Sequence, residues 1–270
     1  MTKVELVFSD IDGTLLNSKH EVTAEASQII QDLVKKGTKI ILASARPPGA
    51  MVSIADEVRL SSPLVCFNGA LITQYTEGSF DDLYSLTLER LDALQLYQTI
   101  STKFPEISFN IYSGERWYVE REDEWVKQEA AITKMDPESI SMEYFLKEHL
   151  PVHKILCMGN PDDIQKLEDE LARANLSNIS YYRSKDTYME IVNNQVSKLG
   201  ALHFLCEKYG VALANTLAIG DNFNDMPMII HAGKGIAMGN APDEVKQAAD
   251  CVTDTNDENG FYKALMKIFG

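Results

Sequence analysis

The sequence predicts an α/β protein in which a parallel-sheet domain is interrupted by a smaller α+β domain. Short apolar runs alternate with helical patterns at both ends of the chain, as in parallel βαβ units. The middle of the chain loses this regularity. The 270 residues, 45% of them hydrophobic, allow one large domain or two smaller ones. We expect residues 1–82 and 193–270 to form the sheet domain and residues 83–192 the inserted one.

The first part of the chain reads as strand, helix and strand. Residues 4–9 form a short, β-branched apolar run that suits a buried strand. Residues 21–36 have apolar side chains at helical spacing and end at Gly37. Residues 39–43 and 64–67 read as two further buried strands, and the second of them ends in an Asn-Gly turn.

The middle of the chain mixes the two patterns. We expect helices at residues 88–104, 143–148 and 162–175, and strands at residues 109–112, 117–120, 153–158 and 188–192. Acidic residues number 20 and basic residues 12 between positions 83 and 192, so this domain carries a charge of −8.

The parallel pattern resumes near the end of the chain. Helices are expected at residues 200–209, 226–232 and 241–249, strands at residues 216–219, 235–238 and 251–253, and a closing helix after Asn259-Gly260.

Composition excludes several functions. Lys and Arg number 25 against 40 Asp and Glu, a net charge of −15, so nucleic acid and anionic membranes are repelled. No apolar run approaches the roughly 20 residues of a membrane span. The beginning of the chain is too short and acidic for a signal peptide. The four cysteines lie far apart, as expected of reduced thiols in a cytoplasmic protein. We expect a monomer or a weak homo-oligomer.

Polar residues follow four of the predicted strands, where open α/β sheets bind ligands. The residues at these four strand ends include Asp10, Ile11 and Asp12; Ser44, Ala45 and Arg46; Asn68; and Asp221, Asn224 and Asp225. Taken singly, each group could be a turn or a helix cap. Taken together, several carboxylates at one edge would repel each other unless a cation lay among them. Such an oxygen cage suits Mg²⁺.

Lys198 follows the inserted domain, close to a helix start. A cation is electrostatically unfavourable there. The residue could be a solvated lysine, or its ammonium could face an anionic ligand.

These residues resemble the four motifs of the haloacid dehalogenase superfamily, in the order and spacing of its Cof-type sugar-phosphate phosphatases. The motifs are Asp10-Ile11-Asp12-Gly13-Thr14, Ser44, Lys198 and the run from Gly220 to Asp225; residues 235–241 also resemble that branch. The resemblance implies a haloacid dehalogenase-like Rossmannoid core with an inserted α+β cap. Two departures concern Ala45, where the family usually has Gly, and Leu199, which separates Lys198 from Gly200.

The resemblance also implies roles. Asp10 would attack the phosphorus atom and bind Mg²⁺, and Asp12 would act as general acid and base while its backbone carbonyl binds the metal. Asp221 would complete the metal shell, and Asp225 would assist it. Phosphate oxygens would be held by Ser44, Lys198 and Asn224 and by backbone N–H groups at Ile11 and Ala45.

The implied activity is the magnesium-dependent hydrolysis of a small phosphorylated metabolite, such as a sugar phosphate or a phosphorylated cofactor. Arg46, Asn68, Tyr188 and Glu190 are candidates for recognising the rest of the substrate. One alternative is a phosphomutase, which would need a basic cap and would release no free phosphate. Another is a non-catalytic phosphate-binding module, which would be expected to lack Asp10, Asp12 or Lys198.

Overall fold

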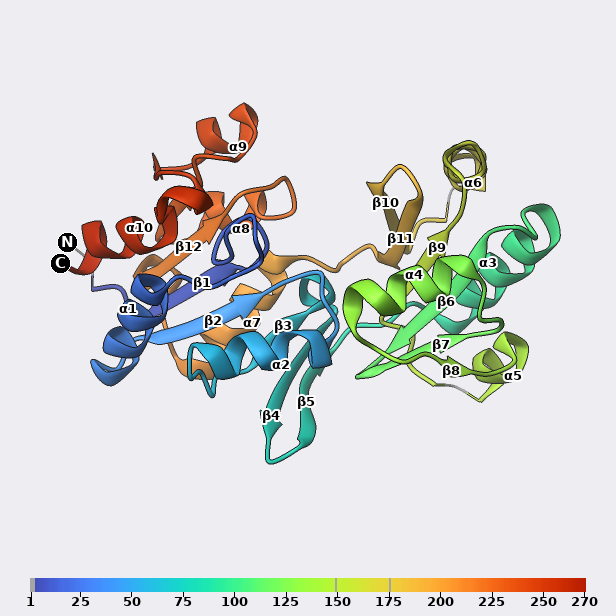
Figure 1. Ribbon diagram of the computed structural model, residues 1–270, viewed down its shortest axis with the longest axis horizontal. Coiled ribbons are helices and arrows are strands. Elements are labelled where there is room, and N and C mark those ends of the chain that lie inside the picture. Colours follow the sequence, from blue (N-terminus) through green and yellow to red (C-terminus); the bar gives the residue numbers. More distant parts are fainter. Residues whose placement is uncertain (1–2, 149, 175) are drawn as a thin grey trace. The chain divides into compact units, whose positions relative to one another are not determined.

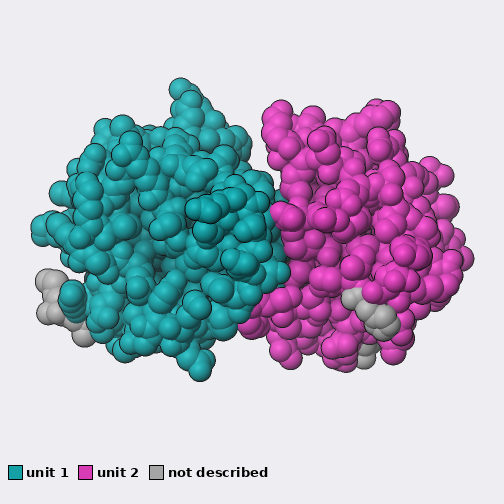
Figure 2. Space-filling model, turned by 90° about the horizontal axis from the view of Figure 1, so that it is seen from below, with its two compact units in different colours: residues 1–83, 197–270 teal, residues 84–196 magenta. Residues whose placement is uncertain are grey.

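The computed structural model describes residues 3–148, 150–174 and 176–270. The chain divides into two compact units (Figure 2). We call residues 1–83 with 197–270 the core unit, and residues 84–196 the inserted unit. Asn175, the last residue of one predicted helix, lies outside the described residues.

The core unit is built on an eight-stranded sheet in the order β14-β13-β12-β1-β2-β3-β4-β5 (Figure 1). The strands are β1 (Leu6–Asp10), β2 (Lys39–Ala43), β3 (Leu64–Cys66), β4 (Leu71–Thr76), β5 (Ser79–Ser85), β12 (Thr216–Gly220), β13 (Lys234–Ala237) and β14 (Cys251–Val252). Pairing is parallel from β14 to β3, whereas β4 runs antiparallel to β3. The α/β prediction is confirmed. The sheet is mixed because β4 is antiparallel to β3, and the sequence analysis predicted neither β4 nor β5.

The strand β1 lies inside this sheet, and all five of its residues are buried. It pairs with β2 on one side and with β12, about two hundred positions later in the chain, on the other. The blue and orange strands therefore lie next to each other in Figure 1. This pairing unites the two ends of the chain in one sheet.

Helices lie between these strands in the chain and after the last of them. They are α1 (Ala24–Lys35), α2 (Pro48–Glu57), α7 (Lys198–Tyr209), α8 (Met226–His231), α9 (Asp243–Ala248) and α10 (Gly260–Phe269), with 3₁₀ turns η1 (Phe67–Gly69), η2 (Leu213–Asn215) and η3 (Asn256–Glu258). Thr23 caps α1 by accepting a hydrogen bond from the N–H of Ala26. Pro48 opens α2, where its fixed φ suits a first helical position.

The inserted unit contains a six-stranded sheet in the order β10-β11-β9-β6-β7-β8. Its strands are β6 (Ser108–Ser113), β7 (Arg116–Val119), β8 (Glu138–Ser139), β9 (Lys154–Met158), β10 (Ile179–Lys185) and β11 (Tyr188–Asn193). Its helices are α3 (Arg90–Lys103), α4 (Glu124–Thr133), α5 (Met142–Lys147) and α6 (Pro161–Ala174). Alternate strand residues such as Ile111, Ile155 and Ile191 form one apolar core with α3, α5 and α6.

The described helices include none that is both long and apolar enough to cross a membrane. All four cysteines are unpaired.

Candidate active site

Three carboxylates meet at the carboxyl ends of two neighbouring strands of the core sheet. Asp10 is the last residue of β1, and Asp221 and Asp225 follow the adjacent β12. One oxygen of each lies within 4.8 Å of an oxygen of the others. The parallel pairing of β1 with β12 brings these oxygens together, because parallel strands end at the same edge of the sheet.

Lys198 supplies a buried positive charge to this cluster. Its Nζ donates to Oδ1 of Asp10 and, at 2.6 Å, to Oδ1 of Asp225. Its side chain has no exposed surface. Ser197 caps α7 by accepting from the N–H of Gly200, which places Lys198 in the first helical turn. The helix dipole disfavours a cation there, and the two carboxylates offset that effect.

The carboxylates are incompletely neutralised. Burial, together with the charges of Asp225 and Asp221, raises the pKa of Asp10 well above its ordinary value, against the opposing effect of Lys198. Burial and the charge of Asp225 raise the pKa of Asp221 to about 6, although the Thr14 hydroxyl and Lys198 act in the opposite direction. The cluster therefore holds like charges close together at some energetic cost.

These residues fit a divalent cation. When ionised, three carboxylates against one ammonium leave two uncompensated negative charges. The donor atoms are oxygens, which Mg²⁺ prefers. Asp10 and Asp221 would be the ligands. Asp225 is completely buried, and its Oδ2 accepts hydrogen bonds of 3.0 Å from the N–H groups of Asp221 and Asn222. Asp225 thus shapes the loop that carries Asp221.

Asp12 faces a different set of partners. Its carboxylate accepts two hydrogen bonds from Arg46, from Nε at 2.8 Å and from Nη2 at 2.6 Å, and a longer one of 3.4 Å from the Ser44 hydroxyl. The bond to Asp12 raises the pKa of the Arg46 guanidinium. The Asp12 side chain is 43% exposed. Asp12 therefore lies outside the buried carboxylate cluster but beside the end of β2.

Gly13 and Thr14 hold Asp221 against the turn after β1. Gly13 has φ +81°, and a Cβ there would lie 2.5 Å from Oδ2 of Asp221. The Thr14 hydroxyl donates to Oδ1 of Asp221 at 3.0 Å. Only glycine combines this backbone conformation with so close an approach.

Further predicted residues lie at the same sheet edge. Asn224 donates from Nδ2 to Oδ1 of Asn68 at 3.1 Å. Ile11 is fully buried, and Ala45 is half-buried beside Ser44. The methyl group of Ala45 is therefore accommodated within the turn after β2.

Tyr188 and Glu190 belong to the inserted unit, where both side chains have partners. The Tyr188 hydroxyl donates to Glu129 at 2.9 Å. Glu190 pairs with Lys154 at 3.2 Å and accepts from the Tyr182 hydroxyl. These contacts form a buried polar network on the sheet face opposite the apolar core.

Two residues and one contact of the site were not predicted from the sequence. Thr14 belongs to the first motif but had no predicted role. Asn240, whose side chain donates to Gly13 and Asp221, was predicted only as part of the segment 235–241. The pairing of Arg46 with Asp12 was also not expected. The resemblance of residues 235–241 to the Cof-type branch was the available signal for Asn240.

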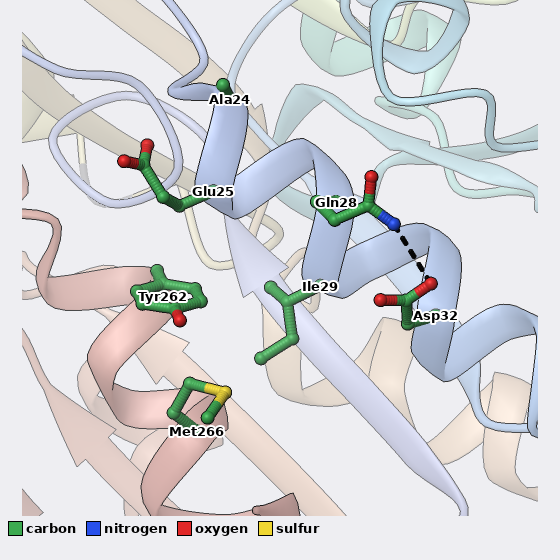
Figure 3. A pocket seen from close by; sticks show the side chains of 7 residues that line it. All are labelled: Ala24, Glu25, Gln28, Ile29, Asp32, Tyr262 and Met266. Carbon is green, nitrogen blue, oxygen red and sulfur yellow. Dashed lines mark hydrogen bonds between the residues drawn. The ribbon is translucent and has the colours of Figure 1, made fainter.

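A groove elsewhere in the core unit carries fewer groups suited to catalysis. This groove, of about 450 Å³ between α1 and α10, is lined by Glu25, Gln28, Asp32 and apolar residues (Figure 3). Its carboxylates are spread along one helix, and Gln28 donates to Asp32. The strand-end cluster is therefore the better candidate for catalysis.

Comparison with known proteins supports this choice. The sequence profile of the haloacid dehalogenase-like hydrolases matches residues 7–265. A Haemophilus influenzae protein named "Putative phosphatase" is 33% identical over 264 residues, which cover 97% of each chain. A Bacillus subtilis 5-amino-6-(5-phospho-D-ribitylamino)uracil phosphatase is 29% identical over 97% of this chain and 94% of its own.

A solved structure shares the whole fold. The haloacid dehalogenase-like hydrolase from Bacteroides thetaiotaomicron superposes with a TM-score of 0.88 and 33% identity over 99% of this chain and 100% of its own. The resemblance seen in the sequence is thereby confirmed. The chain belongs to the haloacid dehalogenase-like hydrolase family, as a phosphatase of its Cof-type branch.

Proposed function

We propose that this protein is a magnesium-dependent phosphatase that hydrolyses small phosphorylated metabolites through a phosphorylated Asp10. The observation that carries the proposal is the contact of buried Asp10 with Lys198, inside a carboxylate cluster that fits a divalent cation. We include a cytoplasmic location in this proposal, on the basis of the four unpaired cysteines.

Asp10 would be the nucleophile. The ammonium of Lys198 at Oδ1 favours the carboxylate form and reduces the repulsion between Asp10 and an incoming phosphate dianion. Bound Mg²⁺, held by Asp10 and Asp221, would supply further charge neutralisation. Asp225 keeps both Lys198 and the Asp221 loop in place.

Asp12 would move the proton. It stands two residues after Asp10 and would protonate the leaving oxygen, then accept a proton from the water that hydrolyses the acyl phosphate. Arg46 holds both oxygens of Asp12, and the Ser44 hydroxyl adds a third contact. These contacts orient the carboxylate. Ser44, Asn224 and the backbone at Ile11 and Ala45 would hold phosphoryl oxygens.

The substrate class rests on the relatives. The B. subtilis relative acts on a phosphorylated ribitylamino compound, so we propose sugar phosphates or phosphorylated cofactors of similar size. Arg46 and Asn68 in the core unit are proposed to recognise the part of the substrate beyond phosphate, whereas the buried contacts of Tyr188 and Glu190 with Glu129 and Lys154 argue against such a role for them.

Phosphate release from a panel of phosphorylated metabolites, with Mg²⁺ or with EDTA, tests the proposal. We expect release only with Mg²⁺, and a loss on the order of 10⁴-fold or more in Asp10→Asn. The unfolding transition of that variant shows whether its fold is intact. Wild-type activity in a folded Asp10→Asn protein would refute the nucleophile assignment. An isomerised product without free phosphate would instead identify a phosphomutase.

A further inference from the structure

Asn240 joins three segments of the core unit around the candidate active site. It lies in the turn after β13. Its Nδ2 donates to the carbonyl oxygen of Gly13 at 2.9 Å and to Oδ2 of Asp221 at 3.4 Å, and its Oδ1 accepts from the N–H of Asn256 at 3.1 Å. One side chain thus contacts the turn after β1, a predicted metal ligand and the C-terminal segment.

These contacts differ from those of an ordinary turn asparagine. Asparagine in a turn commonly bonds to its own backbone two residues on. The partners of Asn240 lie 16, 19 and 227 positions away in the chain. Asn240 is exposed, so its side chain contributes little to the apolar core. Its contacts tie distant segments together.

Asn240 completes a pair of neutral donors on Asp221. The Thr14 hydroxyl donates to Oδ1 at 3.0 Å, and the Asn240 amide donates to Oδ2. Neither donor carries a charge, so both orient the carboxylate and leave its negative charge available for a cation. Outer groups that orient a ligand in this way commonly change metal affinity by about 10- to 100-fold.

The C-terminal segment supports the same turn at two more points. Asn256 donates from Nδ2 to the carbonyl oxygen of Leu16 at 2.9 Å. Asp257 accepts from the N–H of Ser18 at 2.8 Å. The turn of residues 13–18 is therefore bound to residues 240–257 at Gly13, Leu16 and Ser18, and Asn240 is the member of this set that also reaches Asp221.

We propose that Asn240 is a positioning residue for the magnesium site: it orients Asp221 and fixes the turn after β1 against it. This inference rests on the proposed magnesium-dependent function. Asn240 acts through Asp221 and Gly13, so its removal weakens Mg²⁺ binding and leaves the reacting groups in place.

Calorimetric titration of the full-length protein with Mg²⁺, without substrate, tests the proposal. We expect Asn240→Ala to raise the Kd for Mg²⁺ by about 10- to 100-fold. The matched control is Asn194→Ala, which removes an exposed asparagine that donates to the Ser177 carbonyl oxygen in the inserted unit. The control should keep the wild-type Kd.

A steady-state measurement separates positioning from loss of structure. In Asn240→Ala, the Mg²⁺ concentration for half-maximal activity should rise by the same factor as the Kd. Turnover at saturating Mg²⁺ should return to within about threefold of wild type, as expected when ground-state binding alone is lost. An unchanged Kd overturns the proposal, whether or not the melting temperature falls. If Asn240→Ala does not fold, Asn240→Ser replaces it under the same criteria, because the shorter serine side chain cannot make the three contacts of Asn240 with Gly13, Asp221 and Asn256.

Failure of the proposed function gives a different result. A wild-type protein that releases phosphate in EDTA and binds no Mg²⁺ overturns the magnesium dependence itself. A wild-type protein that binds Mg²⁺ no more tightly than Asn240→Ala overturns only the role of Asn240.

Discussion

Asp10 and Asp12 are two residues apart, yet they occupy unlike surroundings. Asp10 is 6% exposed and contacts the ammonium of Lys198. The Asp12 side chain is 43% exposed and contacts the guanidinium of Arg46. Two carboxyl groups can take different protonation roles only when their environments differ. This difference is consistent with a nucleophile at position 10 and a proton donor at position 12.

Replacing Asp12 by Asn should separate catalysis from stability. The variant loses an ion pair that is partly exposed, and such pairs contribute about 0–1 kcal/mol. We therefore expect little change in the free energy of unfolding measured with urea. Turnover should fall, and it should fall much further for alkyl phosphates than for aryl phosphates, because a poor leaving group needs the proton. Equal slowing of the two substrate types would count against the acid role.

At the scale of an element, the turn between β1 and α1 brings Asp221, a proposed metal ligand, close to the segment that follows Asp10, the proposed nucleophile. Its backbone carries Gly13 with φ +81°, and Asp221 lies where a side chain would otherwise begin. Gly37, which follows α1, has a similar φ of +92° but no atom within 4 Å of an added Cβ. The two glycines therefore share a backbone requirement and differ in one contact.

This pair of glycines gives a matched experiment. Gly37→Ala should lower the free energy of unfolding by about 1 kcal/mol, from backbone strain alone. Gly13→Ala should lower it more and should also weaken Mg²⁺ binding, because the methyl group displaces Asp221. Urea unfolding and Mg²⁺ titration of both variants measure these effects. Equal effects of the two substitutions would show that the contact with Asp221 is unimportant.

Helices and strands with a buried apolar face could be predicted from the sequence, whereas exposed ones could not. The buried strands β1 and β2 and the helix α1, with its buried apolar face, were predicted within a few residues. The strand β5 has no buried residue and carries two aspartates, so it gave no apolar alternation. The helix α4 buries only Val126 and Glu129, too few for a helical stripe.

Some residues of the candidate site could be predicted from the sequence, and some of its contacts could not. Asp10, Asp221 and Ser44 could be identified because parallel strands end at one edge. The pairing of Arg46 with Asp12 and the bridge made by Asn240 depend on side-chain rotamers and on loops joined across 34 and 227 positions. Neither hydrophobic periodicity nor turn signals carry that information.

At the scale of the whole molecule, folding gathers negative charge in a chain that already has a net charge of −15. The pKa of Asp221 rises from 3.8 to about 6 on folding, through burial and the charge of Asp225. The folded state therefore binds more protons than the unfolded state between these values. Stability supplied by this group is lost as the pH rises through that range. A bound cation reverses the effect, because it favours the ionised form.

The melting temperature should consequently respond to Mg²⁺ more strongly at pH 7.5 than at pH 5.0. In EDTA at pH 7.5, Asp221→Asn should raise the free energy of unfolding by up to about 3 kcal/mol, the equivalent of the pKa shift. At pH 4 the two proteins should be nearly equal. Thermal unfolding with and without Mg²⁺ at the three pH values measures both effects. A wild-type protein stabilised equally by Mg²⁺ at pH 5.0 and 7.5 would contradict the assignment.

The pairing of β1 with β12 has a consequence for biosynthesis. Leu6 is made early in translation, but its partner Thr216 emerges from the ribosome only after the inserted unit is complete. Lys198 and Asp221 also lie beyond that unit. A nascent chain therefore displays Asp10 on an unfinished sheet edge, without its ammonium or metal partners. A chain that ends before Lys198 would contain Asp10 but neither its ammonium partner nor Asp221.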